Sequence, residues 1–338
     1  MKQFEPYVPG TPYMLIAAGS GAKNVNLPDG TTTSAAEVKK KLGYPQLLAW
    51  KNEKKELLGW VDYLRNNPDC PCKLVVDSSA YSAWTQGLEI DIDEYIQFIN
   101  NISDVVYWFA ELDKIPGKFR EEHTSEELAE APEISWKNYL YMIKRVNCPK
   151  KILPIFHMGE DFKYLRQMLE YRFEDGEHIE YIGISPDNGV HVAEKVKWYQ
   201  QVWKIIHESS NPNVLTHNFG MTTLSIMEQF PSMSSDSTSW LRYASFGNIL
   251  LCVNHAIKQV YVSNRNPDHP NHFNNLSVSV QDEVRKICAE IGHGISIDNL
   301  INDDENGALR CIFNLYSLDK WRKEFQFNGN KLYSADLW

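Results

Sequence analysis

The chain alternates short apolar runs with amphipathic stretches, and this alternation constrains the fold more than any other feature. Eight runs are typical of strands. They are Tyr13–Ser20, Gln46–Trp50, Lys73–Ser78, Val105–Asp113, Ile152–His157, Tyr181–Ser185, Val214–Gly220 and Ser232–Ser239. The first seven are apolar without strict polar alternation, as buried parallel strands are. The eighth is rich in serine and is the least typical strand of the set.

Helical patterns separate these runs. Apolar residues recur three and four positions apart, which predicts helices packed on a sheet, and Asp93, Ser135 and Asp161 are predicted N-caps. Eight strands alternating with helices over about 240 residues predict an α/β fold, a (β/α)8 TIM barrel. A doubly wound sheet with a dinucleotide site would need a glycine-rich loop after its first strand. The candidate loop, at Gly19–Gly21, lacks the third glycine of that fingerprint.

The barrel is expected to occupy residues 1–250, and residues 251–338 are expected to form a mostly helical C-terminal extension. Val280–Ile291 and the apolar cluster around Leu309–Tyr316 support that extension. The 338 residues suffice for one large domain with a smaller appendage.

Composition excludes several classes of protein. With 10 tryptophans, 17 tyrosines and 14 phenylalanines, the chain is too aromatic to be disordered. No stretch approaches the roughly 18 apolar residues of a membrane span, so no membrane partner is expected. The N-terminal residues lack an apolar core and include Pro6 and Pro9, so we expect no signal peptide and a cytoplasmic location. Six cysteines do not suggest a disulfide scaffold.

The net charge of −10 argues against a protein that coats nucleic acid non-specifically, because such binding depends on neutralising phosphates. An enzyme that holds a few phosphates locally is not excluded. Its phosphate contacts would come from Lys39–Lys41, Arg242, Arg265 and Lys320–Lys323. For Lys39–Lys41, a solvated helix face is the preferred interpretation.

Polar residues stand at the ends of the predicted strands, which in a barrel form the active-site face. They are Asp77, Ser78, Asp113, His157, Gly183, Ser185, His217 and Asp236. Each has an ordinary alternative, because an aspartate can organise a turn and a histidine can be a structural hydrogen-bonding residue. Three aspartates that converge on one mouth are better explained by acid–base or glycosyl chemistry.

Six segments carry a family resemblance. In chain order they are VDSSAYSAWTQG (76–87), AELDKIPG (110–117), PIFHMGE (154–160), YIGIS (181–185), THNFGMT (216–222) and SSDSTSW (234–240). Together they resemble the tRNA-guanine transglycosylase superfamily, and most closely its phage-type members that place 7-deazaguanines in DNA. The resemblance spans about residues 13–250 and leaves the C-terminal part uncovered.

The resemblance implies a pentosyltransferase that exchanges guanine in nucleic acid for a 7-deazaguanine base such as preQ0 or preQ1. Asp236 matches the family's nucleophile, which forms a covalent bond to C1′. Asp77 matches the aspartate that assists catalysis, and Asp113 matches the residue that recognises the base. His157 stands where the family has a glutamine, and Gly183 and Ser185 match its glycine-rich turn only loosely.

Ser78 and His217 complete the expected substrate-binding set. The implied chemistry requires no redox cofactor or metal. The implied partners are the base and a nucleic acid, with DNA favoured over tRNA; whether a homodimer or a partner protein is also involved stays open. If the chain is phage-encoded, the expected location is the host cytoplasm.

Bacterial members of the family hold zinc after the barrel with C-x-C-x-x-C and a histidine, and this chain lacks that motif. Cys252, His255, His269 and His272 form a loose set that could hold zinc. Ordinary buried cysteines and surface histidines are the preferred interpretation.

Three alternatives remain open at the level of sequence. The first is the same base exchange on tRNA, as in queuosine or archaeosine formation. The second is a retaining glycoside hydrolase, which also needs two carboxylates and for which Trp84 and Trp240 could serve as sugar platforms. The third is a non-catalytic module that binds a nucleobase.

Overall fold

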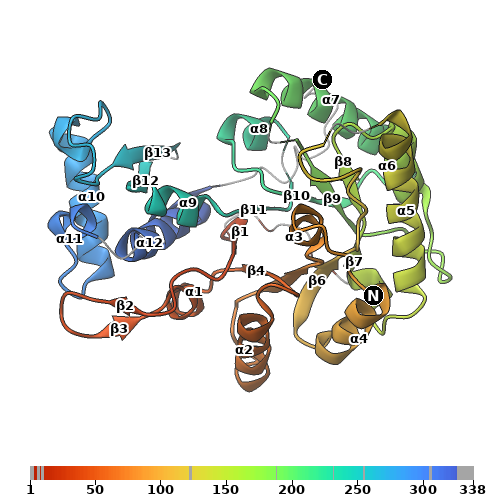
Figure 1. The fold of residues 1–338 in the computed structure, drawn as a ribbon, viewed down its shortest axis with the longest axis horizontal. Helices are drawn as coiled ribbons and strands as arrows, with labels where there is room; N and C mark the ends of the chain where they lie inside the picture. Colours follow the sequence, from red (N-terminus) through yellow and green to blue (C-terminus); the bar gives the residue numbers. More distant parts are fainter. Residues whose placement is uncertain are drawn as a thin grey trace.

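The computed structural model describes residues 4, 5, 8, 11–121, 124–187, 189–230, 232–253, 256–303 and 307–325. Its main feature is a nearly closed, barrel-like sheet of nine parallel strands (Figure 1). The strands are β1 (Met14–Ala18), β4 (Gln46–Ala49), β5 (Leu74–Asp77), β6 (Val106–Ala110), β7 (Ile152–Leu153), β8 (Ile155–His157), β9 (Tyr181–Ser185), β10 (Leu215–Asn218) and β11 (Ser234–Ser237). Their order in the sheet is β7-β6-β5-β4-β1-β11-β10-β9-β8.

All eight predicted runs contribute to this sheet, but the expected count of eight strands is corrected to nine. The fifth run is divided at Pro154, which has no N–H to donate to a neighbouring strand. As a result β7 pairs with β6 while β8 pairs with β9. The Pro154 carbonyl still accepts a 2.8 Å hydrogen bond from the Gly183 N–H. The two edge strands of the sheet are therefore consecutive pieces of one run.

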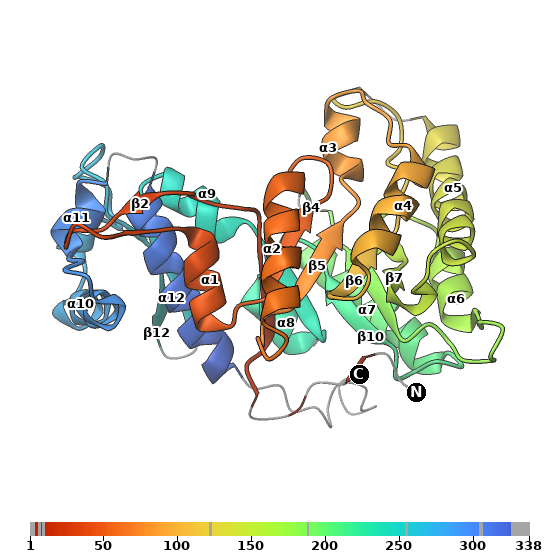
Figure 2. The same cartoon turned by 90° about the horizontal axis from the view of Figure 1, so that it is seen from below.

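Helices connect most of the strands. They are α2 (Lys54–Asn66), α3 (Ala80–Thr85), α4 (Ile92–Ile102), α5 (Ser125–Ile143), α6 (Phe162–Glu170), α7 (Val192–Glu208) and α8 (Leu224–Gln229). Most of these helices lie outside the sheet, while α3 lies beyond the carboxyl end of β5 (Figure 2). Outward-facing strand residues and the inner faces of most of these helices form one large apolar core. A smaller core, including Ile16, Val75 and Trp108, fills the inside of the barrel.

Local capping explains where three of these helices begin. Asp161 caps α6 as predicted, accepting a hydrogen bond from the Lys163 N–H. The two other predicted caps are wrong. Asp91, rather than Asp93, caps α4, and α5 begins ten residues before Ser135, at a capping box that Thr124 forms with Glu127.

A second lobe lies beside the barrel, on the left in Figure 1. Its elements are β2 (Val25–Asn26), β3 (Thr32–Thr33), α1 (Ala35–Leu42), α9 (Ser239–Ser245), β12 (Asn248–Val253), β13 (Ala256–Tyr261), a 3-10 helix (Phe273–Asn275), α10 (Val278–Ile291), α11 (Ile297–Ile301) and α12 (Ala308–Glu324). Val38 of α1 shares one core with Ile249 of β12 and Phe313 of α12. The lobe therefore combines residues after β1 with the C-terminal part of the chain, and its β12–β13 hairpin was not predicted.

Buried side chains of α12 hold the hairpin in place. Asn314 accepts a 2.6 Å hydrogen bond from the Leu250 N–H, and Ser317 accepts one of 2.8 Å from the Cys252 N–H. These contacts satisfy backbone donors of β12, whose other edge pairs with β13. Among the described residues, no helix is long and apolar enough to cross a membrane.

Candidate active site at the carboxyl ends of the strands

Strand geometry brings most of the predicted site residues to the inside of the barrel. The core there includes Val75, Ile155, Tyr181 and Leu215. Side chains alternate along a strand, so the residue two positions after each of these also points into the barrel. The four residues found in this way are Asp77, His157, Gly183 and His217. Asp236 follows Ser234 by two positions, and Ser234 hydrogen-bonds to the Tyr181 hydroxyl inside the barrel.

Asp77 ends β5 and is held by the turn that follows it. The Ser79 N–H donates a 2.7 Å hydrogen bond to its Oδ1, and Ser79 has a left-handed backbone with φ of 66°. Burial raises the pKa of Asp77 to about 7; the Ser79 N–H opposes the rise, and the charges of Asp113 and Asp236 add to it. This coupling indicates that all three carboxylates lie near the same space.

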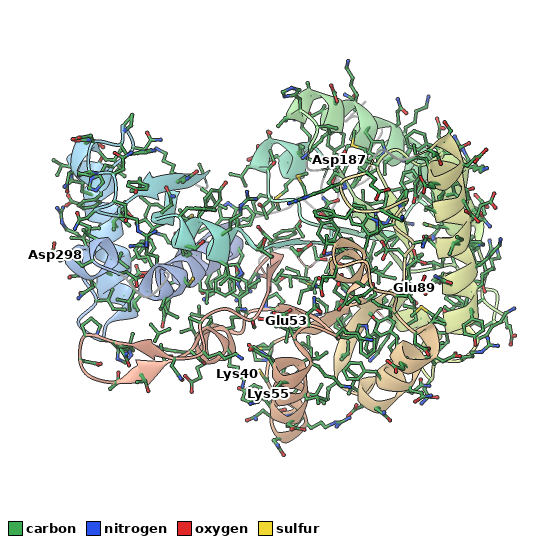
Figure 3. All side chains as sticks on the ribbon, in the orientation of Figure 1. Lys40, Glu53, Lys55, Glu89, Asp187 and Asp298 are labelled. Carbon is green, nitrogen blue, oxygen red and sulfur yellow. The ribbon has the colours of Figure 1, made fainter. Side chains whose placement is uncertain are left out.

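Glu53 also contributes to the raised pKa of Asp77. Figure 3 shows it near the middle of the molecule, where the barrel adjoins the second lobe. Its carboxylate accepts hydrogen bonds from the Ser20 and Ala49 N–H groups, at 2.7 and 2.9 Å. Glu53 therefore fixes the loops after β1 and β4 while adding negative charge behind Asp77.

Asp113 and His157 form a close pair across the mouth. His157 Nε2 lies 3.1 Å from Asp113 Oδ2, although the ring N–H is not directed straight at that oxygen. Burial acts to lower the pKa of His157, but Asp113 and Glu160 outweigh it and the pKa is raised. Two nearby carboxylates favour the charged form of the ring.

A cavity of about 190 Å³ adjoins Asp113. Trp84 of α3 and Asn138 of α5 also line it. The Trp84 indole N–H donates a 2.9 Å hydrogen bond to the Gly117 carbonyl, which fixes the ring beside the cavity. A carboxylate beside a fixed aromatic ring can recognise the N–H edge of a planar ligand.

Asp236 is nearly buried, with 8% of the residue exposed. Its Oδ1 accepts a 2.7 Å hydrogen bond from the Gly220 N–H and lies 3.3 Å from His217 Nε2. His217 is in turn fixed by a 2.6 Å contact between its Nδ1 and the Ser234 hydroxyl, and by packing against Phe219. Because both contacts of the carboxylate involve Oδ1, Oδ2 is the oxygen available to a ligand.

The other predicted binding residues have distinct surroundings. Gly183 faces the ring of Phe219: an added Cβ would lie 2.5 Å from its Cε2, so only glycine leaves room for the ring. The Ser185 carbonyl accepts a hydrogen bond from the Met158 N–H. Ser78 is buried, and its hydroxyl lies 3.4 Å from the Ala80 N–H at the start of α3. This contact suits a turn-forming role for Ser78.

Two acids beside the predicted set were not singled out from the sequence as site residues. Glu160 accepts a 3.2 Å hydrogen bond from the His157 N–H, and burial raises its pKa to about 7. Glu111 is fully buried, accepts a 2.6 Å hydrogen bond from the Ile155 N–H, and has a pKa raised well above its usual value by burial. The signal was available in their spacing, since each lies two or three residues from Asp113 or His157.

Two of the candidate phosphate contacts are corrected. Lys39 is fully buried: its ammonium donates to the Gly19 carbonyl at 2.8 Å and to Gln46, and burial lowers its pKa to about 7. It lies neither on a solvated face nor within reach of a phosphate. Arg322 is also buried and pairs with Asp319. Arg242 and Arg265 are exposed.

The loose zinc set is not brought together in the part of the chain that the structure describes. Cys252 Sγ contacts Glu324, the His269 ring stacks on Tyr261, and His272 Nδ1 accepts a hydrogen bond from the Asn274 N–H. His255 lies outside the described residues. Across the described ranges, no three His, Cys, Asp or Glu side chains are grouped so that they could hold a metal ion.

Comparison of the chain with models of protein families and with curated proteins finds no match, so the resemblance drawn from its motifs stays a prediction.

Proposed function

We propose that this protein is a guanine transglycosylase that exchanges guanine in nucleic acid, preferably DNA, for a 7-deazaguanine base. The observation that carries the proposal is the convergence of Asp77, Asp113 and Asp236 at one end of a barrel-like sheet, where two of them raise the pKa of the third. Cleavage of an N-glycosidic bond passes through a transition state that resembles an oxocarbenium ion, which nearby carboxylates stabilise.

In this proposal Asp236 is the nucleophile. Its Oδ2 attacks C1′ of the target nucleotide and the C1′–N9 bond breaks, so that a covalent ester joins Asp236 to the sugar. Guanine leaves with the electron pair of that bond and takes up a proton from water. The Gly220 N–H donates to Oδ1 and His217 Nε2 lies 3.3 Å from it, which supports this role because the carboxylate is then oriented. The target nucleotide must leave its stack to reach the mouth, because C1′ is shielded in a duplex.

Asp77 is the general base. It removes a proton from the incoming 7-deazaguanine, whose nitrogen then attacks C1′ and releases Asp236. A pKa of about 7 supports this role, since a base works best when its pKa lies near the working pH. Two successive inversions at C1′ give net retention of configuration.

Asp113 recognises the base. Its carboxylate accepts hydrogen bonds from the ring N–H and the exocyclic amine, and Trp84 packs beside the planar ring in the adjoining cavity. His157, whose Nε2 lies 3.1 Å from Asp113 Oδ2, stands in the region where the resemblance implies a glutamine. Ser185 and the wall at Gly183 complete the pocket for the base.

The proposal includes a finer description of the fold. We interpret the sheet as a (β/α)8 barrel whose fifth strand is divided at Pro154, because β7 and β8 are separated by that residue alone. The chemistry needs neither a redox cofactor nor a metal. DNA is preferred to tRNA because the zinc motif of the bacterial tRNA enzymes is absent from the sequence.

The test is an exchange assay with labelled guanine and a labelled 7-deazaguanine on tRNA, single-stranded DNA and double-stranded DNA. We expect label to enter DNA with the parent protein and with Asp62→Ala, a control on the exposed face of α2. We expect Asp236→Ala to lose exchange. Digestion of a trapped protein–nucleic-acid adduct should map the modified peptide to Asp236.

Three outcomes would redirect or reject the proposal. Exchange on tRNA alone would keep the reaction but change the substrate. Hydrolysis of a glycoside without base exchange would favour the glycoside hydrolase. Base binding without exchange or adduct on any nucleic acid would favour the binding module and reject the enzyme.

A further inference from the structure

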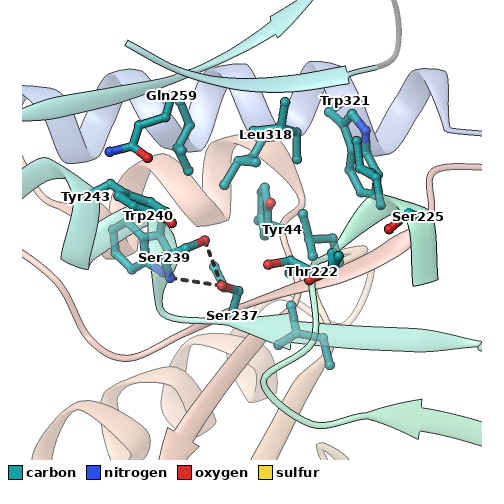
Figure 4. A pocket seen from close by; sticks show the side chains of 17 residues that line it. Tyr44, Thr222, Ser225, Ser237, Ser239, Trp240, Tyr243, Gln259, Leu318 and Trp321 are labelled. Carbon is teal, nitrogen blue, oxygen red and sulfur yellow. Dashed lines mark hydrogen bonds between the residues drawn. The ribbon is translucent and has the colours of Figure 1, made fainter. Parts of the chain in front are cut away.

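A pocket of about 480 Å³ lies outside the barrel wall, between β11 and the second lobe (Figure 4). The β1 and β11 strands form one wall, α8 forms the rim, and the β12–β13 hairpin and α12 form the opposite wall. Its volume is within the range of about 300–1,000 Å³ that is usual for small-molecule sites. The mouth residues Asp77, Asp113 and Asp236 do not line it.

The lining of this pocket carries no formal charge. Its 17 residues are apolar, aromatic, hydroxyl-bearing or amide-bearing, and none is Asp, Glu, Lys, Arg or His. An ionised ligand group buried there would lack a counter-charge, which is costly. The pocket therefore favours an uncharged ligand.

Aromatic rings and small polar groups alternate around the pocket. Tyr44, Trp240, Tyr243 and Trp321 supply rings, while hydroxyls such as those of Ser239 and Thr222 face the same space in Figure 4. Among the described residues, the buried Tyr44 hydroxyl has no hydrogen-bond partner. Rings that stack on a flat surface, together with donors and acceptors for its edge, are the features that bind nucleobases.

Residues that line the pocket are close in sequence to residues of the mouth. Ser237, which lines the pocket, directly follows Asp236 on β11, and Thr222 follows Gly220, which binds Asp236, by two residues. Strand alternation sends the Asp236 side chain into the barrel and the Ser237 side chain outward. A ligand in the pocket would thus contact the segments that orient Asp236.

We propose that this outer pocket is a second binding site, for an uncharged nucleobase-type heterocycle. The heterocycle is either part of a free nucleoside or an unstacked base of a bound strand, and both present the same flat ring with a polar edge. The site is separate from the base-exchange site at the mouth, so its occupation does not depend on catalysis.

The test measures binding of adenosine, guanosine, cytidine and uridine by titration calorimetry and by intrinsic tryptophan fluorescence, with no nucleic acid present. Two variants fill the pocket from separate elements: Gln259→Trp on the hairpin wall and Ser225→Trp on α8 at the rim. Their matched controls are Lys258→Trp and Glu228→Trp, which alter exposed neighbours outside the lining. Thermal melting establishes that each variant folds, and the two blocking variants provide independent readings.

We expect at least one nucleoside to bind, and both blocking variants to weaken it more than tenfold while the controls and Asp236→Asn bind as the parent does. No binding of any of the four at millimolar concentration would overturn the proposal. Equal binding by blocked and control variants would also overturn it, and loss in Asp236→Asn would move the ligand to the mouth. With a single-stranded DNA decamer, weaker binding in the blocked variants would assign the heterocycle to a strand; unchanged binding would assign it to a free nucleoside.

Discussion

The two faces of β11 lead to two different environments. On the inner face, Asp236 joins Asp77 and Asp113 at a mouth crowded with negative charge. On the outer face, Ser237 borders an uncharged pocket of about 480 Å³. One strand therefore separates the proposed exchange site from the proposed second binding site. The difference shows that the larger cavity and the chemically reactive cluster need not coincide.

The mouth and the outer pocket also differ in how burial of their side chains affects the free energy of folding. Buried carboxylates oppose folding when they are ionised, whereas an uncharged pocket carries no such penalty. The pKa values of Asp77 and Glu160, both raised to about 7, record this cost at the mouth. Variants at the mouth should therefore change activity and pH dependence without changing nucleoside binding at the outer pocket.

After the loss of exchange expected of Asp236→Ala, the next largest effect is expected from Asp77→Asn. Asparagine keeps an acceptor for the Ser79 N–H but cannot take up a proton, so base exchange should fall about a thousandfold. Exchange kinetics with a labelled 7-deazaguanine measure this effect. Exchange at the parent rate would remove Asp77 as the base, and a parallel loss of nucleoside binding would break the separation between mouth and pocket.

Asp77→Asn should also be more stable than the parent protein at high pH. The folded-state pKa of Asp77 lies above the unfolded value, so the stability that the group contributes is lost as pH rises from about 4 to about 7. Asp77→Asn should raise the free energy of unfolding by about 4 kcal/mol at pH 8 and by far less at pH 4. Urea unfolding at the two pH values checks this, and an equal effect at both would contradict it.

Glu111→Ala should destabilise the barrel by about 3 kcal/mol. The change leaves the Ile155 N–H without its carboxyl acceptor beside the break at Pro154, and it opens a small cavity. Glu111→Gln is the matched control, because glutamine keeps an acceptor for the Ile155 N–H and a side chain of nearly the same size. Equal losses in the two variants, measured by urea unfolding, would mean that the hydrogen bond to Ile155 is not the cause.

A change of pH should alter the exchange rate less than the Asp77→Asn substitution does. Because the base must be ionised, kcat/KM should rise about tenfold per pH unit below the Asp77 pKa of about 7 and then level off. Nucleoside binding at the outer pocket should change less over the same range, since no side chain of its lining is charged and Lys39 reaches only the Trp240 ring, with Nζ 4.2 Å from the ring centroid. A flat exchange profile below pH 7 would contradict the assignment of Asp77.

Gly183→Ala should have the smallest effect, about 1 kcal/mol in stability. The new Cβ displaces the Phe219 ring, which packs against His217 beside Asp236. The exchange rate should therefore fall clearly although the free energy of unfolding changes little. Nucleoside binding at the outer pocket should not change. Thermal melting and exchange kinetics on one preparation compare the two quantities.

Much of the sheet followed from the sequence because apolar runs of strand length identify buried strands without knowledge of their neighbours. The sequence also predicted which side chains stand at the carboxyl ends of the strands, since parallel strands bring these ends to one face. These side chains are Asp77, His157, His217 and Asp236. The division at Pro154 was readable from the residue itself, yet whether a proline ends a strand depends on the pairing on either side. The start of α5 was misplaced because Ser135 lies within the helix, where its hydroxyl contacts the Ala131 carbonyl.

What the sequence determined by itself was the alternating α/β pattern and the polar ends of its strands, because both depend on spacing along the chain. Only the tertiary structure decided which groups lose contact with water. It buried Lys39, raised the pKa of Glu160, and joined α1 to the C-terminal lobe. It also formed the outer pocket from β1, α8 and the hairpin. Burial, pKa and cavities arise from neighbours distant in sequence, and no local pattern records those neighbours.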